Sequence, residues 1–331
     1  MAVETNGSAT TLFPNGGWDT HHHIFDRKNR KHLPQRPLSH VDVAIAFPYN
    51  AQRHLTPPAA TIQQYETFKR DLGITRSVLA HGLSYGDDCS SLGAFVRQLG
   101  EHRTSSVAVI DPEKTTDDEI YQLNAGGTRG IRLNLYRYGA MDNVELQKKV
   151  LDAHIKRLQS TSVKWSIALT TTRTAAWDDL QAFIQDNVSQ SGISLVTDHF
   201  ACLKAPSMLA PEFQADPTQQ PGFQSIMRLV HDGHLWVKLS APYRASEQSP
   251  RYDDLNFLVR AFVDANKHRV VWGSDWPHTP RMKTRSHEEA MKETPFLDID
   301  DETWLWSLRK WLSDEEWDLL MVQNPNALYG R

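Results

Sequence analysis

Short runs of Val, Ile and Leu recur along the chain, and longer segments with the periodicity of amphipathic helices separate them. This alternation is typical of repeated strand–helix units around a parallel sheet. The strands are expected at residues 18–23, 77–80, 106–110, 130–135, 163–169, 193–197, 235–239 and 270–273. Helices are expected between most of them, for example at residues 59–72, 90–102, 143–160, 175–188 and 253–266. Eight such alternations predict an α/β fold closed into a (β/α)8 TIM barrel.

The alternative, an open doubly wound sheet, lacks the glycine-rich phosphate turn that normally follows a strand in such folds. Gly126 and Gly127 lead into a strand and not into a helix. Residues 18–331 are therefore assigned to a single barrel domain, which a flexible tail at residues 1–17 precedes.

Two proline-punctuated segments without clear periodicity, residues 27–58 and 205–221, are predicted to be long loops beside strand ends. Loops in this position of a barrel often shape the substrate pocket. The tryptophan-rich segment 304–317 is predicted to form amphipathic helices that pack on the barrel as part of its core.

The composition is that of an ordinary globular enzyme, with 40% hydrophobic and 23% charged residues among 331. A net charge of −4 gives no general attraction to nucleic acids or anionic membranes. The two cysteines, Cys89 and Cys202, cannot build a disulfide framework and suit a reducing cytosol. Residues 1–17 lack the features of a secretory signal, and no run of about 18 apolar residues occurs. We therefore expect a cytoplasmic protein without a nucleic-acid or membrane partner.

The first candidate for chemistry is the sequence Asp-Thr-His-His-His-Ile-Phe at residues 19–25. Side chains alternate along a strand, so His21 and His23 point to one side of it and His22 to the other. At the end of the first strand, the two imidazoles on one side would converge at the barrel mouth. Histidine pairs at this spacing are also common in packed or surface positions, so partners are needed to indicate a catalytic site.

Two later strand ends supply such partners. His199 follows the apolar strand at 193–197, and Asp275 follows the last strand at 270–273. The active sites of barrels are assembled at the carboxyl ends of their strands. The simpler interpretations are that His199 bonds the following loop and that Asp275 caps a helix.

Two histidines on the first strand, a later histidine and an aspartate on the last strand together resemble the amidohydrolase superfamily, in its amidohydrolase-related family 2. The resemblance covers nearly the whole chain, and it is strongest to the branch that contains 2-pyrone-4,6-dicarboxylate lactonase. Further stretches that carry it are Leu-Thr-Pro-Pro at 55–58, Tyr-Gly-Asp-Asp at 85–88, Gly-Ile-Arg-Leu-Asn at 130–134, and residues 236–244, 324–325 and 328–330.

This resemblance implies a hydrolase that opens a lactone, either a carboxylated pyrone or muconolactone or a sugar-acid lactone. It implies that Asp275 is the general base for a water molecule. It also implies that His21, His23 and His199 orient the water and polarise the carbonyl group. The chemistry is reasonable in itself, because hydrolysis needs a proton acceptor beside the water and donors where the oxyanion develops.

A small anionic substrate needs cationic side chains, and Arg132, Arg137 and Arg244 lie near predicted strand ends. Guanidinium groups match carboxylates in bidentate geometry, so these three are candidates for substrate binding. Tyr243 and Lys238 lie in the same family-like stretch as Arg244 and complete the set. For Lys238, pairing with a buried carboxylate is an equal alternative.

One departure from the family pattern bears on specificity. Residue 55 is Leu where the family has Tyr, which removes a hydroxyl group that could contact the substrate. The native substrate is therefore expected to differ from that of the dicarboxylate lactonase.

His21, His23, His199 and Asp275 are a sufficient ligand set for one zinc ion with an open position for water. A second metal is not expected, because the end of the strand at 163–169 supplies neither Lys nor Glu. Enzymes that resemble the dicarboxylate lactonase work without a metal, whereas related decarboxylases with the same four residues use zinc. We predict that no metal is required and keep one Zn²⁺ as the alternative.

Two other functions stay open from the sequence. One is a zinc-dependent decarboxylase or other lyase acting on an aromatic or muconate-type acid, and the other is a barrel that binds a ligand without catalysis. A ring-opened product, as opposed to released CO2, would separate a lactonase from the lyase. The sequence does not decide the oligomeric state, and a homo-oligomer is compatible with it.

Overall fold

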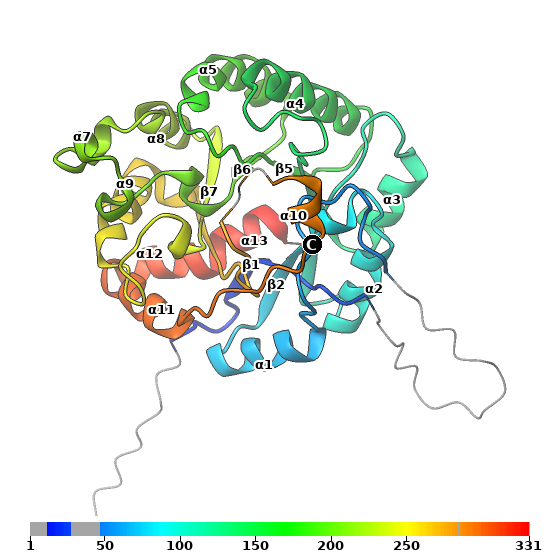
Figure 1. Ribbon diagram of the computed structural model, residues 1–331, viewed down its shortest axis with the longest axis horizontal. Coiled ribbons are helices and arrows are strands. Elements are labelled where there is room, and N and C mark those ends of the chain that lie inside the picture. Colours follow the sequence, from blue (N-terminus) through cyan, green and yellow to red (C-terminus); the bar gives the residue numbers. More distant parts are fainter. Residues whose placement is uncertain (1–11, 28–46, 282, 284, 331) are drawn as a thin grey trace, which may run out of the picture.

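Eight parallel strands follow one another around a nearly closed barrel in the computed structural model, which describes residues 12–27, 47–281, 283 and 285–330 (Figure 1). Each strand pairs in parallel with the next one along the chain. The strands are β1 (Trp18–His22), β2 (Arg76–Ala80), β3 (Thr104–Ala108), β4 (Thr128–Arg132), β5 (Ser166–Ala168), β6 (Leu195–Thr197), β7 (Leu235–Ser240) and β8 (Val270–Gly273). The prediction of a (β/α)8 TIM barrel is confirmed.

The first and last strands meet just beyond the end of β8. A parallel bridge joins His22 to Trp276, and the His23 amide donates to the Trp276 carbonyl over 2.8 Å. The register between β1 and β2 shifts between Asp19 and His22, which places an extra residue in β1. The irregularity therefore lies where the chain enters its His-x-His sequence.

Helices surround the strands on the outside of the barrel (Figure 1). The covering helices are α1 (Ile62–Leu72), α2 (Ser90–Leu99), α3 (Asp117–Ala125), α4 (Val144–Gln159), α5 (Ala176–Phe183), α8 (Phe223–His231) and α9 (Asn256–Asn266). All five helices named from periodicity are present. The sequence pattern did not predict α3, because this helix buries only Ile120 and has no repeat of apolar positions.

Residues 12–17, which we assigned to a flexible tail, pack against the barrel instead. Phe13 is only 2% exposed, and its ring meets that of Trp272 in β8 edge to face, with ring centroids 5.3 Å apart. The chain is therefore anchored before the first strand, because burial of an aromatic ring stabilises the attachment. The rest of the predicted tail, residues 1–11, lies outside the described residues.

The amino-terminal end of the barrel is closed by α13 (Asn324–Tyr329). Tyr329 is fully buried in a cluster with Trp18 and Val78. Its carbonyl accepts a hydrogen bond of 2.8 Å from the Ser105 hydroxyl. Since this end is filled, ligands have access to the barrel at the opposite end, where the strands terminate.

The two predicted long loops are loops in their described parts. Segment 205–221 holds single turns, namely η4 (Pro206–Met208), α7 (Pro211–Gln214) and η5 (Pro217–Gln219). In segment 27–58, residues 28–46 lie outside the described residues, and residues 47–58 contain no helix or strand element. Thr56 donates to the Ala290 carbonyl over 2.6 Å, and Ser84 to the Leu55 carbonyl over 2.8 Å. These bonds hold residues 47–58 beside the barrel mouth.

The tryptophan-rich segment forms α11 (Asp301–Lys310) and α12 (Asp314–Asp318). Trp304 and Trp317 are buried in the core, as predicted, whereas Trp306 is 42% exposed. None of the helices in the described part of the chain has both the length and the apolar character that a membrane span requires.

Candidate active site

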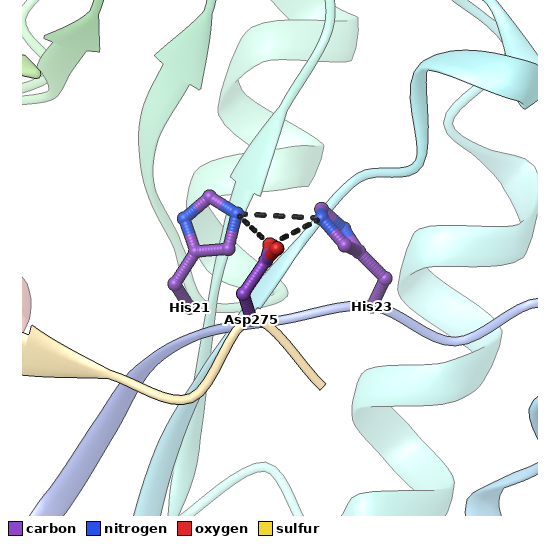
Figure 2. A group of neighbouring side chains, drawn as sticks. All are labelled: His21, His23 and Asp275. Atoms are coloured by element: carbon purple, nitrogen blue, oxygen red, sulfur yellow. Dashed lines mark hydrogen bonds and ion pairs between the residues drawn. The ribbon is translucent and has the colours of Figure 1, made fainter. Parts of the chain in front are cut away.

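Three predicted residues from the two ends of the sequence meet at the barrel mouth (Figure 2). The Nε2 atoms of His21 and His23 lie 3.3 Å apart. Oδ1 of Asp275 lies 3.4 Å from Nε2 of His21 and 3.7 Å from Nε2 of His23. Figure 2 shows both imidazoles directed toward the carboxylate. The alternation of side chains along β1 explains this, because His22 points away and stacks on Tyr65.

His199, which follows β6, completes the group. Its Nε2 lies 3.9 Å from Oδ1 of Asp275, and its Nδ1 lies 2.9 Å from the Ser240 hydroxyl at the end of β7. Burial lowers the pKa of His199 to about 3, so the ring is neutral at working pH. The four residues expected to carry the chemistry are thus side by side and nearly inaccessible to solvent.

The backbone that presents two of these side chains is strained. His199 has a φ of 56° and Asp275 a φ of 63°, in the left-handed region that residues other than glycine rarely adopt. Hydrogen bonds hold the second turn in place: the Asp275 amide donates to the His21 carbonyl over 2.8 Å, and the His278 amide donates to the Asp275 carbonyl over 2.7 Å. Nothing in the sequence pattern announces these conformations.

Asp19 ties the first strand to the last one beneath the site. Its buried carboxylate accepts hydrogen bonds from the His21 amide over 3.0 Å and from the Ser274 amide over 2.9 Å. The hydroxyl groups of Ser274 and Tyr65 donate to its second oxygen over 2.7 and 2.9 Å. The carboxylate therefore fixes the backbone next to both His21 and Asp275.

The two oxygens of Asp275 have different surroundings. Oδ2 accepts hydrogen bonds from the Tyr243 hydroxyl over 2.5 Å and from Nη2 of Arg244 over 3.2 Å. Oδ1 is buried and accepts no hydrogen bond from the described residues. Burial alone would raise the pKa of Asp275, but nearby His199 and Arg244 outweigh it and hold the pKa well below its usual value. Asp275 is an ionised carboxylate with one free oxygen facing three imidazoles.

A backbone contact determines which tautomer the His23 ring adopts. Its Nδ1 lies 2.8 Å from the Ala80 carbonyl, which can only accept, so Nδ1 carries the hydrogen. Burial and the neighbouring His21 and Arg132 hold the pKa of His23 well below its usual value, so the ring is neutral. Nε2 therefore presents a lone pair to Asp275.

His21 has two alternative partners for its Nδ1 atom. Oδ1 of Asp198 lies 3.2 Å away, and Nζ of Lys238 lies 3.3 Å away. If Nδ1 donates to Asp198, a lone pair on Nε2 faces the Asp275 carboxylate. Two electron-pair donors then lie side by side, and a cation between them would stabilise the arrangement. If Lys238 donates to Nδ1, Nε2 carries a hydrogen that it can donate to Nε2 of His23, 3.3 Å away, and no cation is needed.

Lys238 does not line the pocket, so the structure contradicts its assignment to substrate binding. The side chain is 1% exposed, and Nζ lies 3.2 Å from Oδ1 of Asp198 and donates to the Thr20 carbonyl over 3.2 Å. The alternative, a buried carboxylate partner, is confirmed. Asp198 was not singled out from the sequence, although its position directly before His199 at a strand end was visible.

Two of the three predicted arginines, Arg132 and Arg244, line the same pocket as His199 and Asp275. Nη2 of Arg244 donates to the Thr279 carbonyl over 2.9 Å, while its buried Nε has no hydrogen-bond partner in the described part of the chain. Both guanidinium groups therefore face the space that a substrate would fill.

Arg137 and Tyr243 have other contacts than expected. Arg137 donates to Asp87 over 2.5 Å and to Asp111 over 2.7 Å, and it lines a neighbouring hollow, not the active-site pocket. Its charge is already neutralised, so it is not a free anion clamp. Tyr243 is buried behind Asp275 and positions that carboxylate. Two pocket residues, His54 and Tyr136, were missed because each lies just outside the family-like stretches at 55–58 and 130–134.

The geometry fits one metal ion. Ligand atoms around a tetrahedral zinc ion, with bonds of about 2.0–2.1 Å, lie about 3.3 Å apart. The separations among His21, His23 and Asp275 run from 3.3 to 3.7 Å, and His199 stands 3.9 Å from the carboxylate. A second group of potential ligands, His21, Asp198 and His199, overlaps with the first. The described residues thus hold groups that could bind a metal.

A family model described as amidohydrolase matches residues 18–331. The chain is 27% identical to a 4-sulfomuconolactone hydrolase of Hydrogenophaga intermedia, over 97% of this chain and 90% of the relative. It is 26% identical to a D-galactarolactone isomerase of Agrobacterium fabrum, over 96% and 92%. It is 23% identical to a 2-pyrone-4,6-dicarboxylate hydrolase of Comamonas testosteroni, over 84% and 82%.

Solved structures share the fold. A protein of Agrobacterium tumefaciens superposes with a TM-score of 0.68 at 23% identity, covering 96% of this chain and 97% of the other. An amidohydrolase of Burkholderia multivorans with bound zinc superposes with a TM-score of 0.57 at 17% identity, covering 95% and 98%.

Proposed function

The chain belongs to the amidohydrolase family, and we propose that it hydrolyses a lactone that carries an acidic group. The observation that carries the proposal is the free oxygen of Asp275, which faces three imidazoles in a pocket that two arginines also line. A proton acceptor, hydrogen-bonding rings and cationic side chains are the components that hydrolysis of an anionic ester needs. Relatives named for a sulfomuconolactone and a pyrone dicarboxylate support this substrate class.

In the proposed reaction, a water molecule lies against Oδ1 of Asp275 and attacks the lactone carbonyl carbon. Asp275 accepts the proton of the water as the new C–O bond forms. The ring C–O bond then breaks, and the same proton passes to the leaving oxygen, which yields a ring-opened hydroxy acid. Tyr243 and Arg244 keep the carboxylate oriented through its other oxygen.

The imidazoles have separate tasks. His23 offers a lone pair at Nε2 and can accept a hydrogen bond from the attacking water, since the Ala80 carbonyl occupies its Nδ1. His199 stands against the same carboxylate oxygen, with the Ser240 hydroxyl fixing its ring. The imidazoles also polarise the carbonyl group, on whose oxygen the oxyanion develops.

Whether the enzyme requires a metal depends on which ring nitrogen of His21 carries the hydrogen. One Zn²⁺ would be held by His21, His23, His199 and Asp275, and when bound it would make the attacking water more acidic. The convergence of their ligand atoms supports this alternative, as does the zinc in the Burkholderia relative of the same fold. Activity without a required metal, which the sequence resemblance implied, stays a prediction.

Arg132 and Arg244 are proposed to bind the acidic group of the substrate. The Nε atom of Arg244 lacks a partner among the described residues, and burial of Arg132 makes its charge costly unless an anion is bound. Arg244 also holds Asp275, so its loss is expected to affect both substrate binding and turnover.

The first test is turnover of a lactone panel that includes muconolactone, a pyrone carboxylate and a sugar-acid lactone. Metal content is assayed in parallel, before and after treatment with a chelator. Chromatography of the product separates ring opening from isomerisation to another lactone and from release of CO2. Activity that survives with negligible metal supports the metal-independent enzyme, and loss that zinc restores supports the metal site. Absence of ring-opened product across the panel would contradict the proposal.

A cytoplasmic location and a homo-oligomeric state stay predictions. Both cysteines, Cys89 and Cys202, are free, which is compatible with a reducing compartment. Sedimentation of the purified protein would measure the oligomeric state.

A further inference from the structure

A second hollow of about 150 Å³ adjoins the active-site pocket. His54, Leu83 and Tyr136 line both spaces, so they form the boundary between them. The rings of His54 and Tyr136 are stacked face to face, with centroids 4.2 Å apart and planes inclined by 9°. The two rings, which we call the aromatic wall, belong to neither the imidazole group nor the arginines described above.

The hydroxyl group of Tyr136 is buried and has no hydrogen-bond partner within the part of the chain that the structure describes. A buried hydroxyl without a partner is unfavourable, which indicates that a ligand or water satisfies it. Burial raises the pKa of Tyr136, while the charges of Arg285, Arg244 and Arg132 act in the opposite direction. The group is therefore a neutral donor close to the cationic side of the pocket.

The loop that carries Tyr136 is held in place before any ligand binds. The Gly139 amide donates to the Tyr136 carbonyl over 3.2 Å, and the Arg137 amide donates to the Asn134 carbonyl over 3.1 Å. The ion pairs of Arg137 with Asp87 and Asp111 tie the same turn to the loops that follow β2 and β3. Arg137 thus fixes the turn that carries Tyr136, one of the two rings of the aromatic wall.

We propose, resting on the proposed function, that Tyr136 determines specificity for the acidic lactone. Its hydroxyl donates a hydrogen bond to an oxygen of the substrate's carboxylate, next to the guanidinium groups of Arg132 and Arg244, and His54 holds the ring in this orientation. Residue 55 is Leu and has no hydroxyl group. In the proposed arrangement, Tyr136 supplies a hydroxyl group from the loop after β4 instead.

The charges around the aromatic wall favour an anion over a neutral group. Burial, together with Arg132 and Arg285, lowers the pKa of His54 to about 4, so His54 is uncharged and adds only its ring face. A carboxylate has enough lone pairs to accept from a phenol and from a guanidinium group at once. A neutral ester in the same place would lose most of the interaction with the arginines.

The test compares muconolactone with its methyl ester, which have the same ring and differ in one negative charge. We expect Tyr136→Phe to lower the preference for the acid over the ester, measured as the ratio of kcat/KM values, about tenfold. The matched control is Tyr138→Phe, whose hydroxyl also lacks a partner in the described chain but lines neither hollow. The control should keep the preference of the wild type within about twofold.

Variants of His54 test the stacked ring separately. His54→Phe preserves a flat ring against Tyr136 and should keep the preference for the acid, whereas His54→Ala should lower it. An unchanged preference in Tyr136→Phe would overturn the proposal, even if both lactones are hydrolysed.

A binding measurement separates this proposal from the proposed function. If the wild-type protein opens no lactone of the panel, the proposed function fails, and Tyr136 is then judged by calorimetric titration with citrate. About tenfold weaker binding of citrate to Tyr136→Phe than to Tyr138→Phe supports the role of the hydroxyl. Equal affinities in the two variants, or no binding of citrate by the wild type, overturn it.

Discussion

In the half of the barrel mouth formed by β1, β6, β7 and β8, the carboxylates of Asp198 and Asp275 have charged partners within the protein. Asp198 lies 3.2 Å from both His21 and Lys238, and the Tyr243 hydroxyl lies 2.5 Å from Asp275. Oδ1 of Asp275 and Nε of Arg244 have no hydrogen-bond partner among the described residues, and both residues line the pocket. This half is organised in advance around one reactive oxygen.

The half formed by β2 and β4 is different. Nε2 of His81 and the hydroxyl of Tyr136 are buried without a hydrogen-bond partner in the described segments, and Arg132 reaches only as far as the His81 carbonyl, at 3.4 Å. Burial, with Arg132 nearby, lowers the pKa of His81 to about 4, so this histidine is neutral. Polar groups of this half thus have few partners among the described residues.

Under the proposed function, the contrast assigns chemistry to the first half and recognition to the second, with Arg244 taking part in both. Catalytic groups gain from bonds made before the substrate arrives, because no reorganisation is needed during the reaction. Groups that select a substrate must stay unpaired until the substrate pairs with them. Substitutions in the first half should therefore lower kcat, and substitutions in the second half should raise KM.

The largest effect is expected for Asp275→Asn. The amide keeps the volume of the side chain but cannot accept the proton, so kcat should fall about 10³-fold with little change in substrate binding. Steady-state kinetics on the best lactone of the panel would measure the loss, and circular dichroism would confirm the fold. Turnover close to that of the wild type would remove Asp275 from the role of base.

A smaller loss is expected for Asp198→Asn, which contacts the reactive group only through His21. Partners of this kind typically contribute about 10- to 100-fold in activity or metal affinity. The variant should therefore lose kcat in that range, and its zinc content should fall if the enzyme binds zinc. A rise in KM alone, with kcat intact, would speak against a positioning role.

The double variant Asp198→Asn/Lys238→Met separates positioning from stability. Asp198→Asn alone leaves the ammonium group of Lys238 buried without its counter-charge, which is strongly destabilising, whereas the double variant removes both charges. We expect the double variant to unfold at a higher temperature than Asp198→Asn and to remain slow in turnover. Recovery of kcat together with stability would show that Asp198 acts on the fold alone.

Arginines on the recognition side should affect KM more than kcat. Arg132→Gln is expected to raise the KM for an acidic lactone about tenfold, because a charged hydrogen-bond donor is lost. Arg137→Gln is the comparison: its guanidinium is bound to Asp87 and Asp111 and acts only through the turn that carries Tyr136, so the rise in KM should be smaller than that of Arg132→Gln. The reverse order of the two effects would assign the anion clamp to Arg137.

The sequence predicted the reactive half well because strand ends of a parallel barrel converge by geometry. Alternation along one strand was enough to place His21 and His23 together, and the end of the last strand placed Asp275. The left-handed φ of Asp275 depends on long-range bonds, so no local pattern could reveal it. The presence of Lys238 was visible, but only packing across the barrel decides whether it faces a substrate or Asp198.

The recognition half was predicted poorly for a physical reason. Its wall residues, His54 and Tyr136, stand on two loops that are far apart in the sequence, and each lies just outside a family-like stretch and not within it. An arginine near a strand end looked the same in sequence whether it contacts only a backbone carbonyl, as Arg132 does, or is bound to two carboxylates, as Arg137 is. Selection among such residues requires knowledge of their partners.

The smallest effect is expected for an ion pair that stabilises the loop after β8, next to Asp275. His278, in the loop after β8, forms a buried ion pair with Asp301 at 2.9 Å. Burial opposes its charge, but Asp301 outweighs it and raises the pKa of His278 above the ordinary value of 6.5. The stabilisation is therefore fully present below about pH 6.5 and is lost as the pH rises through the raised value in the folded state.

His278→Gln should accordingly lower the free energy of unfolding by about 1–2 kcal/mol at acidic to neutral pH, and by less at alkaline pH. For a chain of this size that corresponds to a fall in Tm of a few degrees, measured by thermal denaturation at about pH 6 and pH 9. His231→Gln provides the control, since its pair with Asp232 is exposed and should contribute little at either pH. A destabilisation that is independent of pH would mean that packing of the ring, and not its charge, braces the loop beside Asp275.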